Sequence, residues 1–187
     1  MNVCVFCASS NELAGIFYAE SESLGRAIAL KGWRLVYGGT QEGLMEAAAK
    51  GALKAGGQVK GVIPQCIVDM GLANREITEL QVVADMKERK ALLRESADAF
   101  VVLPGGWGTM DEVAEVITLK HLGMHNKPVI FVNTDGFYDP FFKFLTTAKE
   151  QHFIAQEYES LYKVVRTAEE AIYIDGRLRT ASKPSNT

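Results

Sequence analysis

Short apolar runs alternate with longer amphipathic segments along the whole chain. Most of the runs are unbroken stretches of Val, Ile, Leu, Ala, Phe or Cys rather than alternating apolar and polar residues. Such runs predict strands at 3–7, 34–37, 58–63, 99–103 and 128–132, with short further strands at 82–83 and 161–165. The segments between them have helical periodicity and predict helices at 17–31, 43–55, 86–97, 109–122 and 138–151.

This pattern indicates the fold class. Strands without alternation are typical of a parallel sheet that is buried on both faces, and the strand–helix repeat supplies the covering helices. We therefore predict an α/β fold with a Rossmann-like, doubly wound parallel sheet flanked by helices on both faces. No linker or internal repeat interrupts the pattern, so we expect a single domain over 1–175 and a disordered tail over 176–187. Ligands of such folds bind beyond the carboxyl ends of the strands.

The turn after the predicted strand 99–103 has the composition of an anion site. Gly105, Gly106 and Gly108 let backbone N–H groups approach a ligand, and the following helix directs its positive end there. Thr109 adds a hydroxyl donor. Glu112 puts a carboxylate within one turn of the expected phosphate, which it would repel. Chemistry on the sugar attached to that phosphate is one reason for a carboxylate at this point.

Two further turns follow strands, at 7–10 with Ser9 and at 38–43 with Gly38 and Gly39. The second has P-loop glycine spacing, but Leu44-Met45 stand in place of Lys-Ser/Thr, and the turn at 105–108 lacks the third glycine of the dinucleotide motif. ATP hydrolysis and hydride transfer are therefore disfavoured. Each turn alone could simply be a tight strand-to-helix connection; three at one sheet edge favour a phosphate-bearing small molecule.

Arg89 lies on the apolar side of the predicted helix 86–97, with Met86, Leu92 and Leu93 as its helical neighbours. An arginine there either extends its guanidinium to solvent or serves a site. The neighbouring glycine turn and Glu112 favour the second interpretation.

The predicted helix 109–122 is apolar on two sides. One predicted face carries Met110, Val113, Ala114, Ile117 and Met124, and the opposite face carries Val116, Leu119 and Leu122. One face packs on the sheet, and the other needs a partner. We therefore predict a homodimer with the site near its interface.

Composition and charge limit the partners and the location that the protein can have. The chain has 187 residues and a net charge of −3 with acidic and basic residues spread along it, which argues against a nucleic-acid surface. No apolar run approaches the roughly 20 residues that span a bilayer, so no membrane partner is expected. The start of the chain lacks a basic stretch, so we predict no signal peptide and a cytoplasmic protein. Cys4, Cys7 and Cys66 are expected as free thiols, because Cys4 and Cys7 face opposite sides of one strand.

Two paired motifs resemble the LOG (Lonely Guy) family, whose members are cytokinin-activating phosphoribohydrolases. These are Pro104-Gly105-Gly106-x-Gly108-Thr109-x-x-Glu112 and the preceding Met86-x-x-Arg89-Lys90. The similarity continues through most of the chain, including 35–39, 43–45, 61–64, 75–78, 97–100, 122–129 and 135–138. Ala8, Thr40 and Lys87 depart from common family residues, which leaves the base preference open.

The resemblance implies a Rossmann-like homodimer that hydrolyses the N-glycosidic bond of a nucleoside 5′-monophosphate, without a cofactor or metal. The products are the free base and ribose 5-phosphate. Arg89 and Glu112 match the catalytic positions. Trp107 stands at a variable motif position, where it either stacks on a base or packs the loop. The substrate-binding residues predicted by resemblance and by the three turns are Ser9, Gly38, Gly39, Glu76, Lys90, Gly105, Gly106, Trp107, Gly108, Thr109, Met110, Asp111 and Thr118.

Three alternatives stay open at this point. An older family label, lysine decarboxylase, requires pyridoxal phosphate on a Schiff-base lysine, and no binding apparatus for it is visible in the sequence. A carrier of a nucleotide or of molybdenum cofactor would not need a carboxylate beside a phosphate. A nucleosidase for plain AMP differs only in how the N6 position of the base is recognised.

Overall fold

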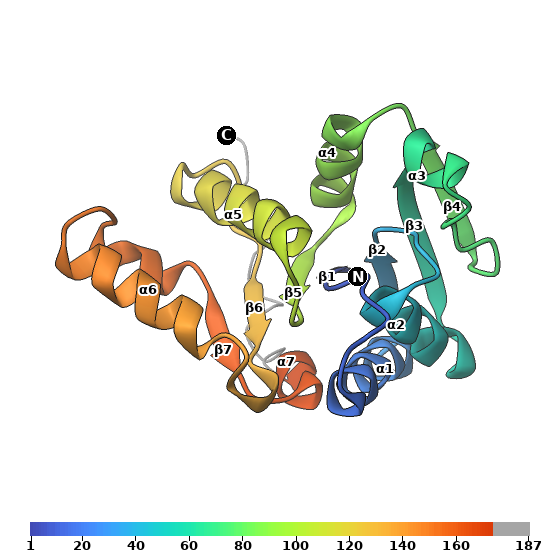
Figure 1. The fold of residues 1–187 in the computed structure, drawn as a ribbon, viewed down its shortest axis with the longest axis horizontal. Helices are drawn as coiled ribbons and strands as arrows, with labels where there is room; N and C mark the ends of the chain where they lie inside the picture. Colours follow the sequence, from blue (N-terminus) through green and yellow to red (C-terminus); the bar gives the residue numbers. More distant parts are fainter. Residues whose placement is uncertain (174–187) are drawn as a thin grey trace, which may run out of the picture.

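One parallel sheet forms the centre of the molecule in the computed structural model, which describes residues 1–173 (Figure 1). Its seven strands have the order β4-β3-β2-β1-β5-β6-β7, and every neighbouring pair is parallel. The chain winds outward in both directions from β1 and β5, so the sheet is doubly wound. The strands are β1 (Asn2–Phe6), β2 (Arg34–Tyr37), β3 (Gln58–Pro64), β4 (Glu79–Val83), β5 (Ala99–Val102), β6 (Val129–Val132) and β7 (Lys163–Val165).

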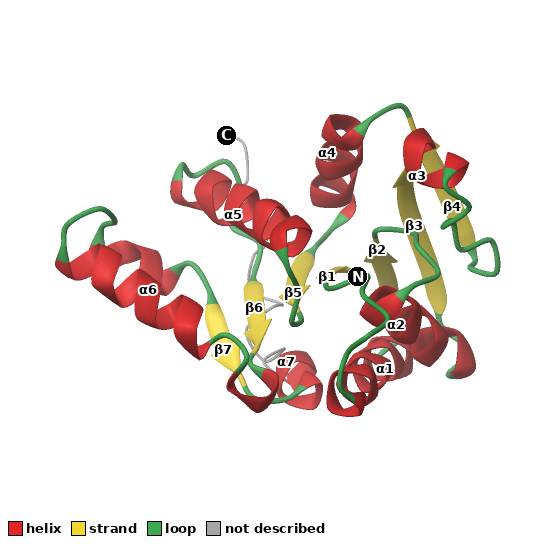
Figure 2. Cartoon of the chain, viewed as in Figure 1, coloured by secondary structure: helices red, strands yellow, loops and turns green. Residues whose placement is uncertain are grey.

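Helices cover both faces of the sheet (Figure 2). The helices α1, α2 and α7 lie on one side, and α4, α5 and α6 on the other (Figure 1). This confirms the predicted fold class. The helices are α1 (Gly15–Leu30), α2 (Gly43–Lys54), α3 (Gln65–Asp69), α4 (Met86–Ser96), α5 (Trp107–His121), α6 (Asp139–Glu150) and α7 (Ala168–Tyr173), with 3-10 turns η1 (Thr134–Gly136) and η2 (Gln156–Ser160).

Alternate residues of β1 enter two separate apolar clusters, one on each face of the sheet. Val3, Val5 and Cys7 belong to the cluster beneath α1, α2 and α7, whereas Cys4 and Phe6 belong to the other. Cys4 and Cys7 are free and buried on opposite faces, as predicted, whereas Cys66 is free and exposed. The strands are thus apolar on both sides, which explains their unbroken apolar sequence.

The helices α1 and α2 approach each other closely at Gly25 of α1, which has no side chain. A Cβ atom at position 25 would lie 1.9 Å from the carbonyl oxygen of Ala48 in α2. In the same contact, the buried hydroxyl of Ser21 donates a hydrogen bond of 2.6 Å to the carbonyl oxygen of Leu44. These contacts fix the start of α2 and therefore the turn that precedes it.

Several element boundaries differ from the sequence predictions. The helix α5 begins at Trp107, two residues before the predicted start, and β4 extends back from 82–83 to Glu79. The short helices α3 and α7 were not predicted. The predicted tail at 176–187 lies outside the described residues. Within residues 1–173, no helix combines the length and the apolar character needed to cross a membrane.

Candidate active site

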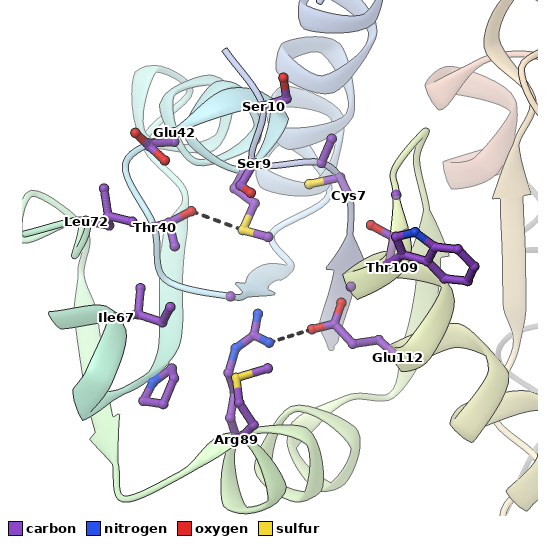
Figure 3. A pocket seen from close by; sticks show the side chains of 18 residues that line it. Cys7, Ser9, Ser10, Thr40, Glu42, Ile67, Leu72, Arg89, Thr109 and Glu112 are labelled. Carbon is purple, nitrogen blue, oxygen red and sulfur yellow. Dashed lines mark hydrogen bonds and ion pairs between the residues drawn. The ribbon is translucent and has the colours of Figure 1, made fainter. Parts of the chain in front are cut away.

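Three turns meet in one cleft at the carboxyl edge of the sheet. They follow β1, β2 and β5, which are neighbours at the centre of the sheet, and the cleft lies where the winding direction reverses between β1 and β5. Its volume is about 380 Å³, and Figure 3 shows its side chains. The lining residues are Cys7, Ala8, Ser9, Ser10, Gly38, Thr40, Glu42, Met45, Pro64, Ile67, Leu72, Met86, Arg89, Gly106, Trp107, Gly108, Thr109 and Glu112.

Arg89 and Glu112 form a buried ion pair in this cleft (Figure 3). The Nη1 atom of Arg89 lies 2.9 Å from Oε1 of Glu112, and the two residues are only 7% and 5% exposed. The Nε atom of Arg89 also donates to the carbonyl oxygen of Val62 at 3.3 Å. Asp85 fixes the start of α4, because its carboxylate accepts the N–H of Glu88 at 2.8 Å. Arg89 is thus held toward Glu112 rather than extended to solvent.

Because Gly38 has no side chain, the guanidinium of Arg89 can occupy the space beside it. A Cβ atom at position 38 would lie 2.3 Å from Nη2 of Arg89. Any side chain there would displace the guanidinium from Glu112. Gly39 lies behind the cleft, beside Ile63 and Leu80, and does not line it.

Burial dominates the titration of Glu112. It raises the pKa of the carboxyl above its ordinary value, although Arg89 opposes this effect and the neighbouring Asp111 adds to it. The nearby thiols of Cys4 and Cys7 also have pKa values raised by burial and by Glu112. Burial therefore disfavours the ionised form of Glu112 and of both thiols, and the guanidinium of Arg89 opposes this effect at Glu112.

The first turn of α5 presents backbone N–H groups to the cleft. Gly106 caps the helix without a side chain, and the first helical bond formed after it runs from the N–H of Met110 to the oxygen of Gly106. The N–H groups of Trp107, Gly108 and Thr109 precede that bond and are left for a ligand. A Cβ atom at Gly105 would lie 2.0 Å from Oγ1 of Thr109, so Gly105 lets Thr109 pack inward.

A buried tyrosine supports this turn from beneath. The hydroxyl of Tyr138 donates a hydrogen bond of 2.7 Å to the carbonyl oxygen of Leu103, and its ring packs edge-on against Phe131. Trp107 stands on the opposite side of the turn, 93% exposed at the mouth of the cleft. An indole left in solvent beside a cleft is available to stack on a ligand.

The wall across the cleft from α5 is partly apolar, and its residues were not predicted as part of the site. Ile67 and Leu72 come from α3 and the loop after it, Met45 from α2 and Met86 from α4. Glu42, also missed, lies at the rim, where one carboxylate oxygen accepts the amide N–H of Asn11 at 3.3 Å. The signal for this wall was Pro64 followed by the apolar Cys66-Ile67-Val68, which starts a helix at a strand end.

Seven predicted substrate-binding residues, Gly39 and Gly105 among them, do not line the cleft, so their substrate contacts stay predictions. Lys90 and Asp111 form an ion pair at 3.0 Å, and Met110 packs in the apolar cluster beneath α5. Glu76 is exposed on the loop before β4, and its N–H donates to Asn74. Thr118 lines a separate groove between α5 and α6. Ser9, Gly38, Gly106, Trp107, Gly108 and Thr109 line the cleft together with Arg89 and Glu112.

In α5, the two predicted apolar faces divide differently. The sequence predicts opposite faces for Val113 and Val116, but both are buried on the sheet side. Residues three apart in a helix are neighbours, which explains the shared side. No group of three or more His, Cys, Asp or Glu side chains that could hold a metal ion occurs in the described part of the chain.

Comparisons with known proteins give a consistent result. The model of a family described as possible lysine decarboxylase matches residues 45–174. A cytokinin riboside 5′-monophosphate phosphoribohydrolase from Rhodococcoides fascians is 42% identical over 172 residues, which cover 91% of this chain and 87% of that protein. The phosphoribohydrolase LOG from Oryza sativa subsp. japonica is 38% identical, over 91% of this chain and 70% of its own length.

A solved structure with another role is also similar. The molybdenum cofactor carrier protein from Chlamydomonas reinhardtii superposes with a TM-score of 0.69 at 26% identity, and the match covers 95% of this chain and 96% of that one. The fold is therefore shared by proteins whose names indicate catalysis and by proteins whose names indicate transport of a cofactor.

Proposed function

Since this chain belongs to the family described as possible lysine decarboxylase, which includes the LOG phosphoribohydrolases, we propose that it is an N-glycosyl hydrolase. Its proposed substrate is an N6-substituted adenosine 5′-monophosphate, and its products are the free base, a cytokinin, and ribose 5-phosphate. The observation that carries the proposal is the buried pair of Arg89 and Glu112, in the same cleft as the free N–H groups of α5.

The reaction breaks the bond between C1′ of the ribose and N9 of the purine. Positive charge develops on C1′ as the bonding electron pair leaves with the base. A carboxylate beside C1′ stabilises that charge and orients water for addition to C1′. We assign this role to Glu112. The proton that the water gives up balances the one that the departing base acquires.

Arg89 acts through Glu112 in this proposal. A guanidinium has a pKa above about 12 and is a poor proton donor. Its distance of 2.9 Å from Glu112 suits it instead to keep that carboxylate ionised against the effect of burial. The remaining guanidinium nitrogen, Nη2, faces the cleft near Gly38, where a ribose hydroxyl could accept from it.

The two ends of the cleft suit the two ends of a nucleotide. The free N–H groups at the start of α5 and the hydroxyl of Thr109 favour the phosphate. The opposite wall, with Met45, Ile67, Leu72 and Met86, favours an apolar substituent on the base. A plain AMP nucleosidase would use the same phosphate end but would gain nothing from the apolar wall.

Lysine decarboxylation has no support in the cleft. Pyridoxal phosphate chemistry needs a lysine that can form a Schiff base with the cofactor. Among the described residues that line the cleft, none is a lysine. Lys90, which follows Arg89 in the sequence, is held by Asp111 and Glu115, each at 3.0 Å.

The test is incubation of the purified protein with AMP and with N6-isopentenyl-AMP, with the released base followed by chromatography. We expect faster release of isopentenyladenine than of adenine. Comparable release from both would identify a general nucleotide nucleosidase. Tight binding of nucleotide with no release from either would overturn the proposal and favour a carrier, the role named for the Chlamydomonas relative.

We also propose that the protein is a cytoplasmic homodimer whose partner is a small nucleotide rather than a nucleic acid. The net charge of −3 opposes binding to a phosphate backbone, and the free cysteines suit a reducing compartment. Thr118 lines a groove apart from the cleft, so it would reach substrate only in a neighbouring copy.

A further inference from the structure

Three basic side chains of α4 face three acidic side chains of α5. Besides the pair of Arg89 and Glu112, Nζ of Lys90 lies 3.0 Å from Oδ1 of Asp111 and 3.0 Å from Oε2 of Glu115. Arg94 pairs with the other oxygen of Glu115. We call this set the ionic ladder; its members are Arg89, Lys90, Arg94, Asp111, Glu112 and Glu115.

The ladder joins two helices that have little other direct contact. The backbones of α4 and α5 stay apart, and each helix packs mainly on the sheet (Figure 1). Leu93 of α4 and Val113 and Val116 of α5 belong to the same apolar cluster beneath the ladder. Between the helices there remains a void of only about 10 Å³, lined in part by Lys90, Glu112 and Glu115. The distance between the helices at the level of Arg89 is therefore set by ionic contacts.

The ion pairs of Lys90 are coupled through the backbone to the pair of Arg89 and Glu112. Lys90 directly follows Arg89, and Asp111 directly precedes Glu112, so the outer contact is covalently adjacent to the catalytic pair on both helices. Glu115 lies one helical turn beyond Glu112 and accepts from both Lys90 and Arg94. Side chains of Lys90, Arg94 and Glu115 are only 23%, 26% and 30% exposed, so solvent screens them less than a surface pair.

We infer that Lys90 and Glu115 are positioning residues, which hold α4 against α5 so that Arg89 and Glu112 stay in register. This inference rests on the proposed function only for its kinetic readout. It gives Lys90 a role different from the substrate contact that the family resemblance suggested, since Lys90 is absent from the residues that line the cleft. Errors of about 1 Å in such alignment cost up to about 100-fold in rate.

Positioning and direct electrostatic effects predict opposite results for Glu115→Gln. Removing a negative charge near Glu112 lowers the pKa of its carboxyl if nothing moves. The positive charge of Arg89 lowers the pKa of Glu112. If the substitution instead loosens the ladder, the contact between Arg89 and Glu112 weakens and the pKa of Glu112 rises. The charged and titratable groups that surround Glu112 are Arg89 and Lys90 from α4, Asp111 and Glu115 from α5, and the neutral thiols of Cys4 and Cys7 from β1.

The experiment compares Lys90→Met, Glu115→Gln and the conservative Lys90→Arg with the unmodified protein. The pKa of Glu112 is read by ¹³C NMR of labelled glutamate carboxyls, assigned with Glu112→Gln, and kcat and KM are measured for nucleotide hydrolysis. Lys87→Met is the matched control, because Lys87 is an exposed lysine of the same helix with no ion pair among residues 1–173.

We expect Glu115→Gln to raise the pKa of Glu112 and to lower kcat about 10-fold, with KM changed less than about threefold. Lys90→Met should do the same, Lys90→Arg should largely restore kcat, and Lys87→Met should change neither quantity. A lowered pKa of Glu112 in Glu115→Gln, or a raised KM with unchanged kcat in Lys90→Met, would overturn the inference. The NMR titration decides it even if the unmodified protein hydrolyses no nucleotide, which would instead overturn the proposed function.

Discussion

Arg89 and Glu112 depend on each other because neither charge would be stable alone at this depth. Arg89 is 7% and Glu112 is 5% exposed. A buried charge that loses its partner keeps its desolvation cost without compensation, whereas the intact pair is close to neutral in its net contribution. The pair is thus weakly stabilising at best, and its presence in a cleft points to chemistry.

The substitution Arg89→Ala should therefore affect both activity and stability. We expect kcat to fall at least about 100-fold, because Glu112 loses the charge that keeps it ionised and aligned. The free energy of unfolding at neutral pH should fall by up to about 3 kcal/mol, as measured by urea denaturation. Arg26→Ala, at an exposed arginine of α1, is the control and should change neither quantity. Near-normal turnover in Arg89→Ala would contradict the role assigned to Arg89.

The pH dependence of hydrolysis should report Glu112. The reaction uses the ionised carboxylate, and burial raises the pKa of that group. Activity should therefore be lost as the pH falls through a pKa above the ordinary glutamate value of about 4.3. In Arg89→Ala the residual activity should be lost at still higher pH, because the opposing charge is gone. A profile of kcat/KM against pH with the same acid limb in both proteins would contradict this role for Arg89.

At the level of helices and strands, the apolar pattern predicted the order of the main elements, because most of the buried strands are unbroken apolar runs. It predicted the start of α5 too late, because Gly106 caps that helix through its backbone conformation and offers no side-chain signal. It missed α3 and α7, which have five and six residues and are too short to show helical periodicity. The apolar wall of the cleft was missed with α3.

The close contact between α1 and α2 gives a test at this level. Gly25→Ala should force the helices apart and lower the free energy of unfolding by about 1–3 kcal/mol, because its Cβ would lie 1.9 Å from the oxygen of Ala48. Gly15→Ala, in the same helix but with no atom within 4 Å of the added carbon, should cost nothing measurable or stabilise slightly. Urea denaturation compares the two. Equal stability of both variants would refute the tight contact.

For the molecule as a whole, the site could be predicted only in part from sequence. The turn at 105–108, Thr109 and Glu112 are contiguous, so their shared location was visible in one motif. Arg89 meets Glu112 because α4 and α5 flank β5 beside β1 in the sheet order, which a linear pattern does not contain. Ile67 and Leu72 reach the cleft from α3 and the loop after it, on the other half of the sheet, and a helix of five residues is too short for its periodicity to be recognised.

The surface of α5 and α6 carries exposed apolar side chains that suit the proposed homodimer. Leu122, Met124, Phe144 and Phe153 are 64%, 70%, 63% and 85% exposed, and a groove of about 620 Å³ runs between the two helices. Apolar surface of this kind commonly marks an interface. Sedimentation equilibrium should give twice the chain mass of 20.5 kDa. Phe144→Glu should shift the equilibrium to monomer, whereas Leu30→Glu, at an exposed leucine of α1, should not. A monomeric unmodified protein at micromolar concentration would refute the dimer.

Catalysis by Glu112 is tested by the products formed from N6-isopentenyl-AMP by the unmodified protein and by Glu112→Gln, together with nucleotide binding to the variant. We expect equimolar isopentenyladenine and ribose 5-phosphate from the unmodified protein. Turnover should be at least about 100-fold lower in Glu112→Gln, with binding retained. Undiminished turnover in the variant, or binding without product in the unmodified protein, would contradict catalysis centred on Glu112.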